Sequence, residues 1–418
     1  MLEALRNAWK IPDLRKRIIF TLMMLLVFRA GSHIPVPGID TSQIKAIIER
    51  GALFGFFDFV SGGAFKNFTI FAMSITPYIN ASIIMQLLTI VIPKLEELAK
   101  EGEAGRKVLA QYTRYGTVIL ALIQAIGMSV GFRSAVIDTS FASLAVIVIS
   151  LTAGTAFLMW LGEQITDKGI GNGISLIIFA GIVSRLPGSA YQLYHLVRVG
   201  TTSIIAVIIF GFVALLVIVG VIAVQQAQRR IPVQYAKRVV GRRMYGGQST
   251  HIPLRVNQAG VIPVIFAMSI LLFPSTIAGF FPNSRIAASI AEFLKPGGWV
   301  YASMYAVLII FFTYFYTAVI FNPVDVSNNI KKYGGFIPGI RPGRPTAQYL
   351  ERVMNRITLA GALFLAAIAV MPYILTGFTT LNIYFGGTAL LIVVGVALET
   401  MKQLEAQMLM RHYEGFLK

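Results

Sequence analysis

Ten long apolar segments divide this chain of 418 residues, and no other feature limits its fold as strongly. Most of them reach the roughly 20 residues that a helix needs to cross about 30 Å of hydrocarbon. They lack the alternation of polar and apolar residues typical of a transmembrane β-barrel. The sequence therefore predicts an all-α polytopic membrane protein with ten transmembrane helices. The segments are 18–37, 68–92, 108–132, 142–161, 172–186, 203–225, 258–279, 299–321, 357–375 and 383–398.

Composition agrees with this class of protein. Hydrophobic residues make up 56% of the chain and charged residues only 13%, against about 25% charged residues in a soluble domain. The chain has no cysteine, which excludes disulfides and thiol chemistry. Residues 1–17 are basic and amphipathic, and no small-residue cleavage site follows a short apolar core. We therefore expect a cytoplasmic amphipathic helix there and not a cleaved signal.

Positive charge orients the predicted helices. With a cytoplasmic N-terminus, the segments on that side hold 26 Lys and Arg, and the opposite segments hold seven. Cytoplasmic loops carry such an excess of cations. Both termini, including the tail 399–418, are thus predicted to be cytoplasmic. Seven of the cations lie in the loop 226–257 and six in the loop 322–356.

Five spans in each half predict an inverted repeat, because the second half then starts from the opposite side of the membrane. The halves are 18–186 and 203–398, with an external linker at 187–202. The fifth spans, 172–186 and 383–398, are expected to be short, at about 22 to 24 Å of helix. Short spans with glycine-rich starts point to a pathway between the repeats. Ordinary short helices that are buried by their neighbours are the alternative.

The predicted spans contain almost no ionisable groups. None of the 18 Asp and Glu lies in a span, and of the histidines only His33 does, near a span end. Proton-coupled transport, metal coupling and intramembrane hydrolysis place such groups at membrane depth because the chemistry requires them. The GIGNG motif at 169–173 lacks the lysine of a phosphate loop. We therefore predict a conduit or scaffold without enzyme activity, metal or cofactor, with a secondary transporter of a small solute as the alternative.

Segment 52–66, with sequence ALFGFFDFVSGGAFK, differs from the other external loops. It is aromatic and apolar but too short to span the membrane, and glycines interrupt it. This pattern predicts a short re-entrant or interfacial helix before the second span. Two interpretations remain open from composition alone: a helix anchored at the membrane surface by phenylalanines, and a movable stopper packed inside a cavity.

Six motifs occur in a fixed order along the chain: PYINASIIMQLLT (77–89), GIGNGIS (169–175), RRIPVQYAKR (229–238), QSTHIPL (248–254), VNQAGVIPVIFA (256–267) and GIRPG (339–343). Together they resemble the SecY family, whose members form the central subunit of the bacterial protein-conducting translocation channel. The resemblance covers essentially the whole chain, and it implies a location in the plasma (inner) membrane of a bacterium. It implies two inverted pseudo-symmetric five-helix halves around an hourglass pore. This pore opens sideways between spans two/three and seven/eight.

The same resemblance implies a ring of aliphatic side chains at the waist of the pore. Such a ring excludes water and ions by dewetting and forms no hydrogen bonds with a passing chain. The ring residues would be Ile79, Ile83, Ile174, Ile178, Ile265 and Ile392. Segment 52–66 would be the plug that seals the idle channel from the outer side. The plug residues would be Phe56, Phe57, Phe59, Ser61, Gly62 and Gly63.

Polar seam residues and basic loops complete the implied functional sites. The resemblance places a lateral gate at Thr89, Gln124 and Asn257. It implies that Arg242, Arg243 and Arg341 dock the ribosome or the SecA ATPase, and guanidinium groups suit phosphate contacts. Attraction to anionic lipids is the alternative for both loops. The implied partners are the SecE and SecG subunits, the SecA ATPase, the ribosome, signal-sequence-bearing polypeptides and membrane lipids.

Overall fold

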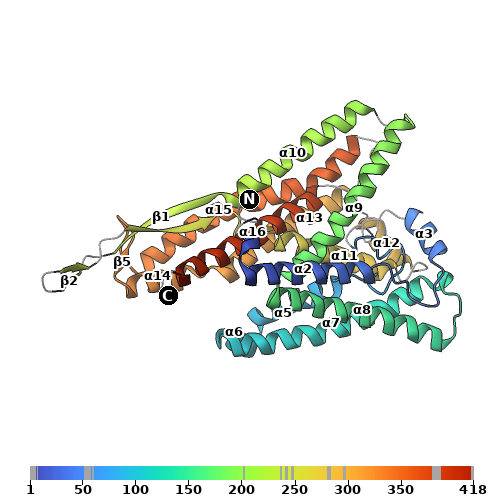
Figure 1. The fold of residues 1–418 in the computed structure, drawn as a ribbon, viewed down its shortest axis with the longest axis horizontal. Coiled ribbons are helices and arrows are strands. Elements are labelled where there is room, and N and C mark those ends of the chain that lie inside the picture. The colour runs from blue at the N-terminus through green and yellow to red at the C-terminus, as the bar shows by residue number, and fades with distance from the viewer. Residues whose placement is uncertain are drawn as a thin grey trace.

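The computed structural model describes residues 6, 8–50, 58, 61–200, 203–235, 238–240, 243–245, 249–279, 284–294, 298–378 and 387–415. Helices dominate this structure (Figure 1). Each predicted apolar segment overlaps one long described helix. These helices are α2 (Pro12–Gly31), α5 (Thr76–Val91), α7 (Glu103–Gly131), α8 (Phe141–Lys168), α9 (Gly173–Arg198), α10 (Ile204–Gln226), α11 (Ile262–Gly279), α13 (Trp299–Ile320), α15 (Arg344–Phe378) and α16 (Gly387–Gly415).

Length and composition assign membrane spans to most of these helices. Of the helices in the described residues, seven are long and apolar enough to cross a membrane. The number becomes eight if α5 and α6 (Pro93–Lys100), which are bent by 101°, form one span. The prediction of a helical polytopic membrane protein is confirmed, and the count of ten spans is compatible with these helices. Short helices α3 (Thr41–Arg50), η1 (Arg133–Ala135), α12 (Arg285–Phe293) and α14 (Pro323–Lys332) lie between the long ones.

The predicted helix ends need correction in both halves. Helices α9 and α16 contain 26 and 29 residues, so the fifth helices are not short. Helix α9 continues through Pro187 and covers most of segment 187–202, where we expected a linker. Hydropathy indicates where a helix leaves the hydrocarbon. The backbone hydrogen bonds of the helix can continue beyond that point into polar sequence, so hydropathy does not give the end of the helix. Conversely, the second helix starts late, because α5 begins only at Thr76, with Pro77 in its first turn, after a stretch of turns from residue 61.

The two halves repeat the same packing. In each half, the second helix packs on the third, the third on the fourth, the fourth on the fifth, and the fifth on the first. The pairs α5–α7, α7–α8, α8–α9 and α2–α9 thus correspond to α11–α13, α13–α15, α15–α16 and α10–α16. The halves meet along two seams. Helix α11 contacts α5 and α7 along one seam, and α9 contacts α16 along the other.

A close backbone contact fixes the start of each fifth helix. A Cβ on Gly173 would overlap the carbonyl oxygen of Gly162 in α8, and a Cβ on Gly387 would overlap that of Ile368 in α15. Only glycine permits this approach. The side chain of Asn172 also caps α9 by accepting a hydrogen bond from a backbone N–H in its first turn, which satisfies a donor that the helix itself leaves free.

The two basic loops fold together into one structure, here called the basic unit (226–257 with 322–356). Strand β1 (Gln228–Tyr235) pairs antiparallel with β4 (Ser249–Arg255) and with β5 (Gly335–Phe336). Strands β2 (Arg238–Val240) and β3 (Arg243–Tyr245) pair beyond them in the arm that projects in Figure 1. The sequence analysis predicted no strands here. The apolar core of the unit consists of Ile231, Val233, Leu254, Ile330, Ile337, Leu350, Val353 and Met354.

The glycine contact between α8 and α9 yields a stability prediction. We expect Gly173→Ala to lower the free energy of unfolding by about 1–3 kcal/mol, because the added methyl group forces the two backbones apart. Thermal unfolding in detergent measures the change as a lower Tm. The matched control is Gly188→Ala on the same helix, where an added Cβ meets nothing within 4 Å. Equal Tm values for the two variants would contradict the proposed contact.

Candidate pore and its seals

Five of the six predicted ring isoleucines are buried in one apolar cluster that extends through both halves. They are Ile79, Ile83, Ile178, Ile265 and Ile392. They come from α5, α9, α11 and α16, which are the helices that form the two seams between the halves. The cluster therefore closes the region where the halves meet. A constriction made of branched aliphatic side chains is a barrier to ions, because it offers them no ligand in place of water.

The sixth predicted ring residue is less buried and packs at the edge of the same cluster. Ile174 is half-buried, and its side chain packs against Gly162 of α8 inside the first half. Ile182, which the sequence analysis missed, is 1% exposed and belongs to the central cluster. It follows Ile178 by four residues and so lies on the same helix face. Ile182 is therefore a further candidate for the contribution of α9 to the ring, beside the predicted Ile174 and Ile178.

The described part of the plug segment packs against α9. Phe56, Phe57 and Phe59 lie outside the described residues, whereas Ser61, Gly62 and Gly63 form turns. Gly62 has a φ of +66°, and a Cβ placed on it would lie 2.7 Å from the Cα of Gly181 in α9. Glycine is required on both counts. The contact places this segment within one helical turn of Ile178 and Ile182.

Two arginines also hold the plug segment. The Nη1 of Arg29 in α2 donates a hydrogen bond to the carbonyl oxygen of Gly62 at 2.8 Å. Arg185 in α9 forms an ion pair with Asp58, which is 5% exposed. The sequence analysis gave no role to these residues. Arg185 and Asp58 are 127 positions apart, and no sequence pattern relates residues at that separation.

The predicted gate residues lie on elements that meet at one seam. Thr89 is on α5 and Gln124 on α7, and Asn257 precedes α11, which contacts both helices. The hydroxyl of Thr89 donates to the carbonyl of Met85 in its own helix at 2.7 Å. Asn257 donates to the nearby carbonyl of Gly260 at 2.9 Å. These two bonds are local and do not cross the seam, so the lateral-gate assignment stays a prediction.

The predicted docking arginines belong to the basic unit. Arg341 is exposed in the turn between β5 and α15, and its carbonyl accepts a hydrogen bond from Thr346. Arg243 belongs to β3, whereas Arg242 lies outside the described residues. Because β5 pairs with β1, the turn that carries Arg341 lies next to the sheet formed by β1 and β4. The docking assignment itself stays a prediction.

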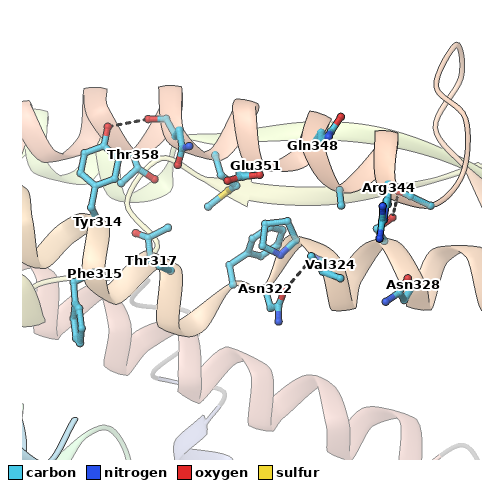
Figure 2. Close-up of a pocket in the computed structure, with 18 of the residues that line it drawn as sticks. Tyr314, Phe315, Thr317, Asn322, Val324, Asn328, Arg344, Gln348, Glu351 and Thr358 are labelled. Atoms are coloured by element: carbon cyan, nitrogen blue, oxygen red, sulfur yellow. Dashed lines mark hydrogen bonds between the residues drawn. The ribbon is translucent and has the colours of Figure 1, made fainter. Parts of the chain in front are cut away.

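Two cavities lie on the basic side of the constriction. The larger, of about 1010 Å³, lies between α13, α14 and α15, where Tyr314 donates to the carbonyl of Asn355 at 3.1 Å (Figure 2). The smaller, of about 430 Å³, is lined by Arg255, Glu399 and Lys402. Neither is lined by a ring isoleucine. Within the described residues, no group of three His, Cys, Asp or Glu could hold a metal ion.

Two inverted five-helix halves that meet at a buried apolar constriction define a helical membrane channel. The chain belongs to the SecY family, which it matches over residues 69–401. It is 52% identical over 432 aligned residues to the protein translocase subunit SecY of Halalkalibacterium halodurans, with 100% of both chains covered. The corresponding subunit of Thermotoga maritima is 49% identical, with 100% of this chain and 98% of that subunit covered.

Solved structures share the fold. A protein-conducting channel superposes with a TM-score of 0.68 at 18% identity, over 94% of this chain and 92% of that chain. A channel from a canine ribosome–channel complex of the endoplasmic reticulum gives a TM-score of 0.64 at 18% identity, with the same coverage. The architecture is thus retained at low sequence identity.

The orientation of α9 yields a prediction that separates two isoleucines. We expect Ile182→Ser to raise the ion leak of the idle channel, because a hydroxyl group in the constriction favours its wetting. We expect Ile174→Ser to destabilise the contact between α8 and α9 without raising the leak. Conductance in planar bilayers measures the first effect, and Tm in detergent measures the second. A leak from Ile174→Ser alone would restore the original ring assignment.

Proposed function

We propose that this chain is the central subunit of a protein translocase in the plasma membrane of a bacterium. Secretory polypeptides cross the membrane through its pore, and hydrophobic segments leave sideways into the lipid. The observation that carries the proposal is the 52% identity, over the full length of both chains, with a protein translocase subunit SecY. The two-half fold with an apolar constriction supports it, since this arrangement suits a conduit for diverse polypeptides.

The constriction suits a substrate of variable sequence. Side chains of isoleucine form no hydrogen bonds, so they retain no particular sequence, and they close against one another when the pore is empty. The seam between α5, α7 and α11 is the proposed side exit. The bonds of Thr89 and Asn257 are local, so opening the seam breaks neither of them. Lipid tails then replace the apolar contacts that the helices lose.

The proposed channel is passive, and partners supply the energy. We assign these roles to the SecA ATPase and the translating ribosome, with SecE and SecG as accessory subunits. A solved yeast Ssh1 complex bound to the ribosome shares this fold with a TM-score of 0.62 at 16% identity. The basic unit offers the exposed cationic surface that such partners require. It lies on the proposed cytoplasmic side, together with both termini.

A reconstituted channel tests the proposed function. Vesicles would contain this chain with SecE, and SecA, ATP and a signal-bearing precursor would be added. We expect the precursor to become protected from protease. An arrested precursor should crosslink to photoreactive probes at Ile83, Ile178 and Ile265 but not at Ile208, which is 65% exposed on α10. Labelling at Ile208 alone would show that the precursor does not enter the constriction.

The exposed turn of the basic unit yields a second test. We expect Arg341→Glu to slow SecA-driven translocation by about tenfold or more, because reversal of a charge at a docking surface creates repulsion. The rate of precursor protection measures the effect. Arg133→Glu, an equivalent reversal at the exposed helix η1, should leave the rate unchanged. Equal rates for both variants would remove Arg341 from the docking surface.

A further inference from the structure

Asp58 is a buried carboxylate in a segment that is otherwise apolar. It is 5% exposed. Its Oδ1 accepts a hydrogen bond from the backbone N–H of Lys66 at 2.6 Å, and its carboxylate pairs with the guanidinium of Arg185. A carboxylate that has lost its water is stable only when such partners compensate for the lost hydration. The location of Asp58 therefore depends on Arg185.

The cationic side of this contact comes from two helices. Arg185 of α9 also donates to the backbone carbonyl of Asp58 at 3.3 Å. Arg29 of α2 donates to Gly62 at 2.8 Å, and its positive charge acts unfavourably on Arg185. The two guanidinium groups thus repel each other, and Asp58 compensates for this repulsion. Without an anion, they would form an uncompensated pair of like charges beside the constriction.

We propose that the ion pair between Asp58 and Arg185, together with the hydrogen bond from Arg29 to Gly62, latches the plug in the closed channel. The inference rests on the proposed function of the chain as a channel. When the plug moves out of the pore, Asp58 separates from Arg185 and Gly62 separates from Arg29. Both arginines are then exposed to water on the plug side of the constriction. The ion pair then contributes directly to the difference in free energy between closed and open channels, in addition to the apolar contacts of the plug.

The local hydrogen bonds permit a variant that removes the charge and keeps the shape. The backbone carbonyl of Asp58 accepts bonds from the N–H of Gly63 at 2.9 Å and from the hydroxyl of Ser61 at 3.2 Å. A side-chain substitution leaves both bonds in place. In Asp58→Asn, the amide oxygen can still accept the bond from Lys66. This variant therefore tests the charge of Asp58 and not the turn that it begins.

Channel conductance measures the latch. In planar bilayers we expect Asp58→Asn and Arg185→Gln each to raise the open probability of the idle channel by about tenfold or more. The double variant should be less open than independent effects would give, because it leaves no unpaired member of the pair. The control is Asp40→Asn, which also removes one negative charge but away from the plug. A hydrogen bond from the Ser42 hydroxyl lowers the pKa of Asp40, so this carboxyl is charged at neutral pH. Unchanged conductance, or independent effects of the two substitutions, would refute the latch.

A labelling experiment provides a readout that does not depend on conductance. The chain has no cysteine, so Ser61→Cys introduces a unique thiol at a position that is 2% exposed. We expect Asp58→Asn to accelerate alkylation of this thiol by a membrane-impermeant maleimide added from the plug side. An unchanged rate would contradict a plug that is released more often.

A deletion separates the latch from the proposed function. Removal of 56–63 should raise the leak of the idle channel whether or not an ion pair exists. If the channel with the deletion leaks, while Asp58→Asn changes neither the conductance nor the alkylation rate, the latch is refuted and the plug assignment is retained. If the deletion does not leak, the plug assignment itself fails, and the latch fails with it.

Discussion

The arrangement of the pore depends on the backbone contact at the start of each fifth helix. Gly173 and Gly387 are the first residues of α9 and α16, and each lies directly against the backbone of the preceding helix in its half. Because α9 and α16 also contact each other, these two contacts fix the position of the helices that form one of the seams between the halves. Ile178 and Ile392 each follow the glycine by five residues. Both halves therefore place a branched side chain at the same depth, and a larger residue at either glycine would displace the constriction.

Hydropathy and charge were sufficient to predict the membrane class and the two inverted halves. Each span must be long and apolar enough to cross the hydrocarbon by itself, so this signal is local in the sequence. They could not predict the end of α9, since its helix continues through Pro187 into polar sequence. Nor could periodicity distinguish Ile174 from Ile182, as both lie four residues from Ile178. The contact with α8 decides the rotation of α9. The pair of Asp58 and Arg185 was equally inaccessible, because only the folded chain brings them together.

The basic unit, too, could be predicted only in part from the sequence. The sequence reveals two clusters of cations, each in its own loop, but the pairing of β1 with β5 joins segments about a hundred residues apart. A shared apolar core packs β1 and β4 against the segment that carries the turn at Arg341, so these parts form one surface. A partner that binds the turn therefore also acts on the hairpin. Because β4 ends just before α11 and α15 continues from the unit into the second half, the proposed docking of a partner would act directly on helices of the pore.

The inverted repeat places comparable polar groups on the two sides of the constriction, but only one side is closed. Arg185 follows Ile178 by seven residues, and Glu399 follows Ile392 by the same interval, so the repeat places them on opposite sides. Arg185 is paired with Asp58, from the segment between the first and second helices of its half. Glu399 and Arg255, from the corresponding segment of the other half, instead line an open cavity of about 430 Å³. In the proposed channel, the chain's own residues would seal the constriction on the plug side, whereas the basic side is accessible through this cavity. This asymmetry is what a channel requires if it receives polypeptides from one side and must not leak before they arrive.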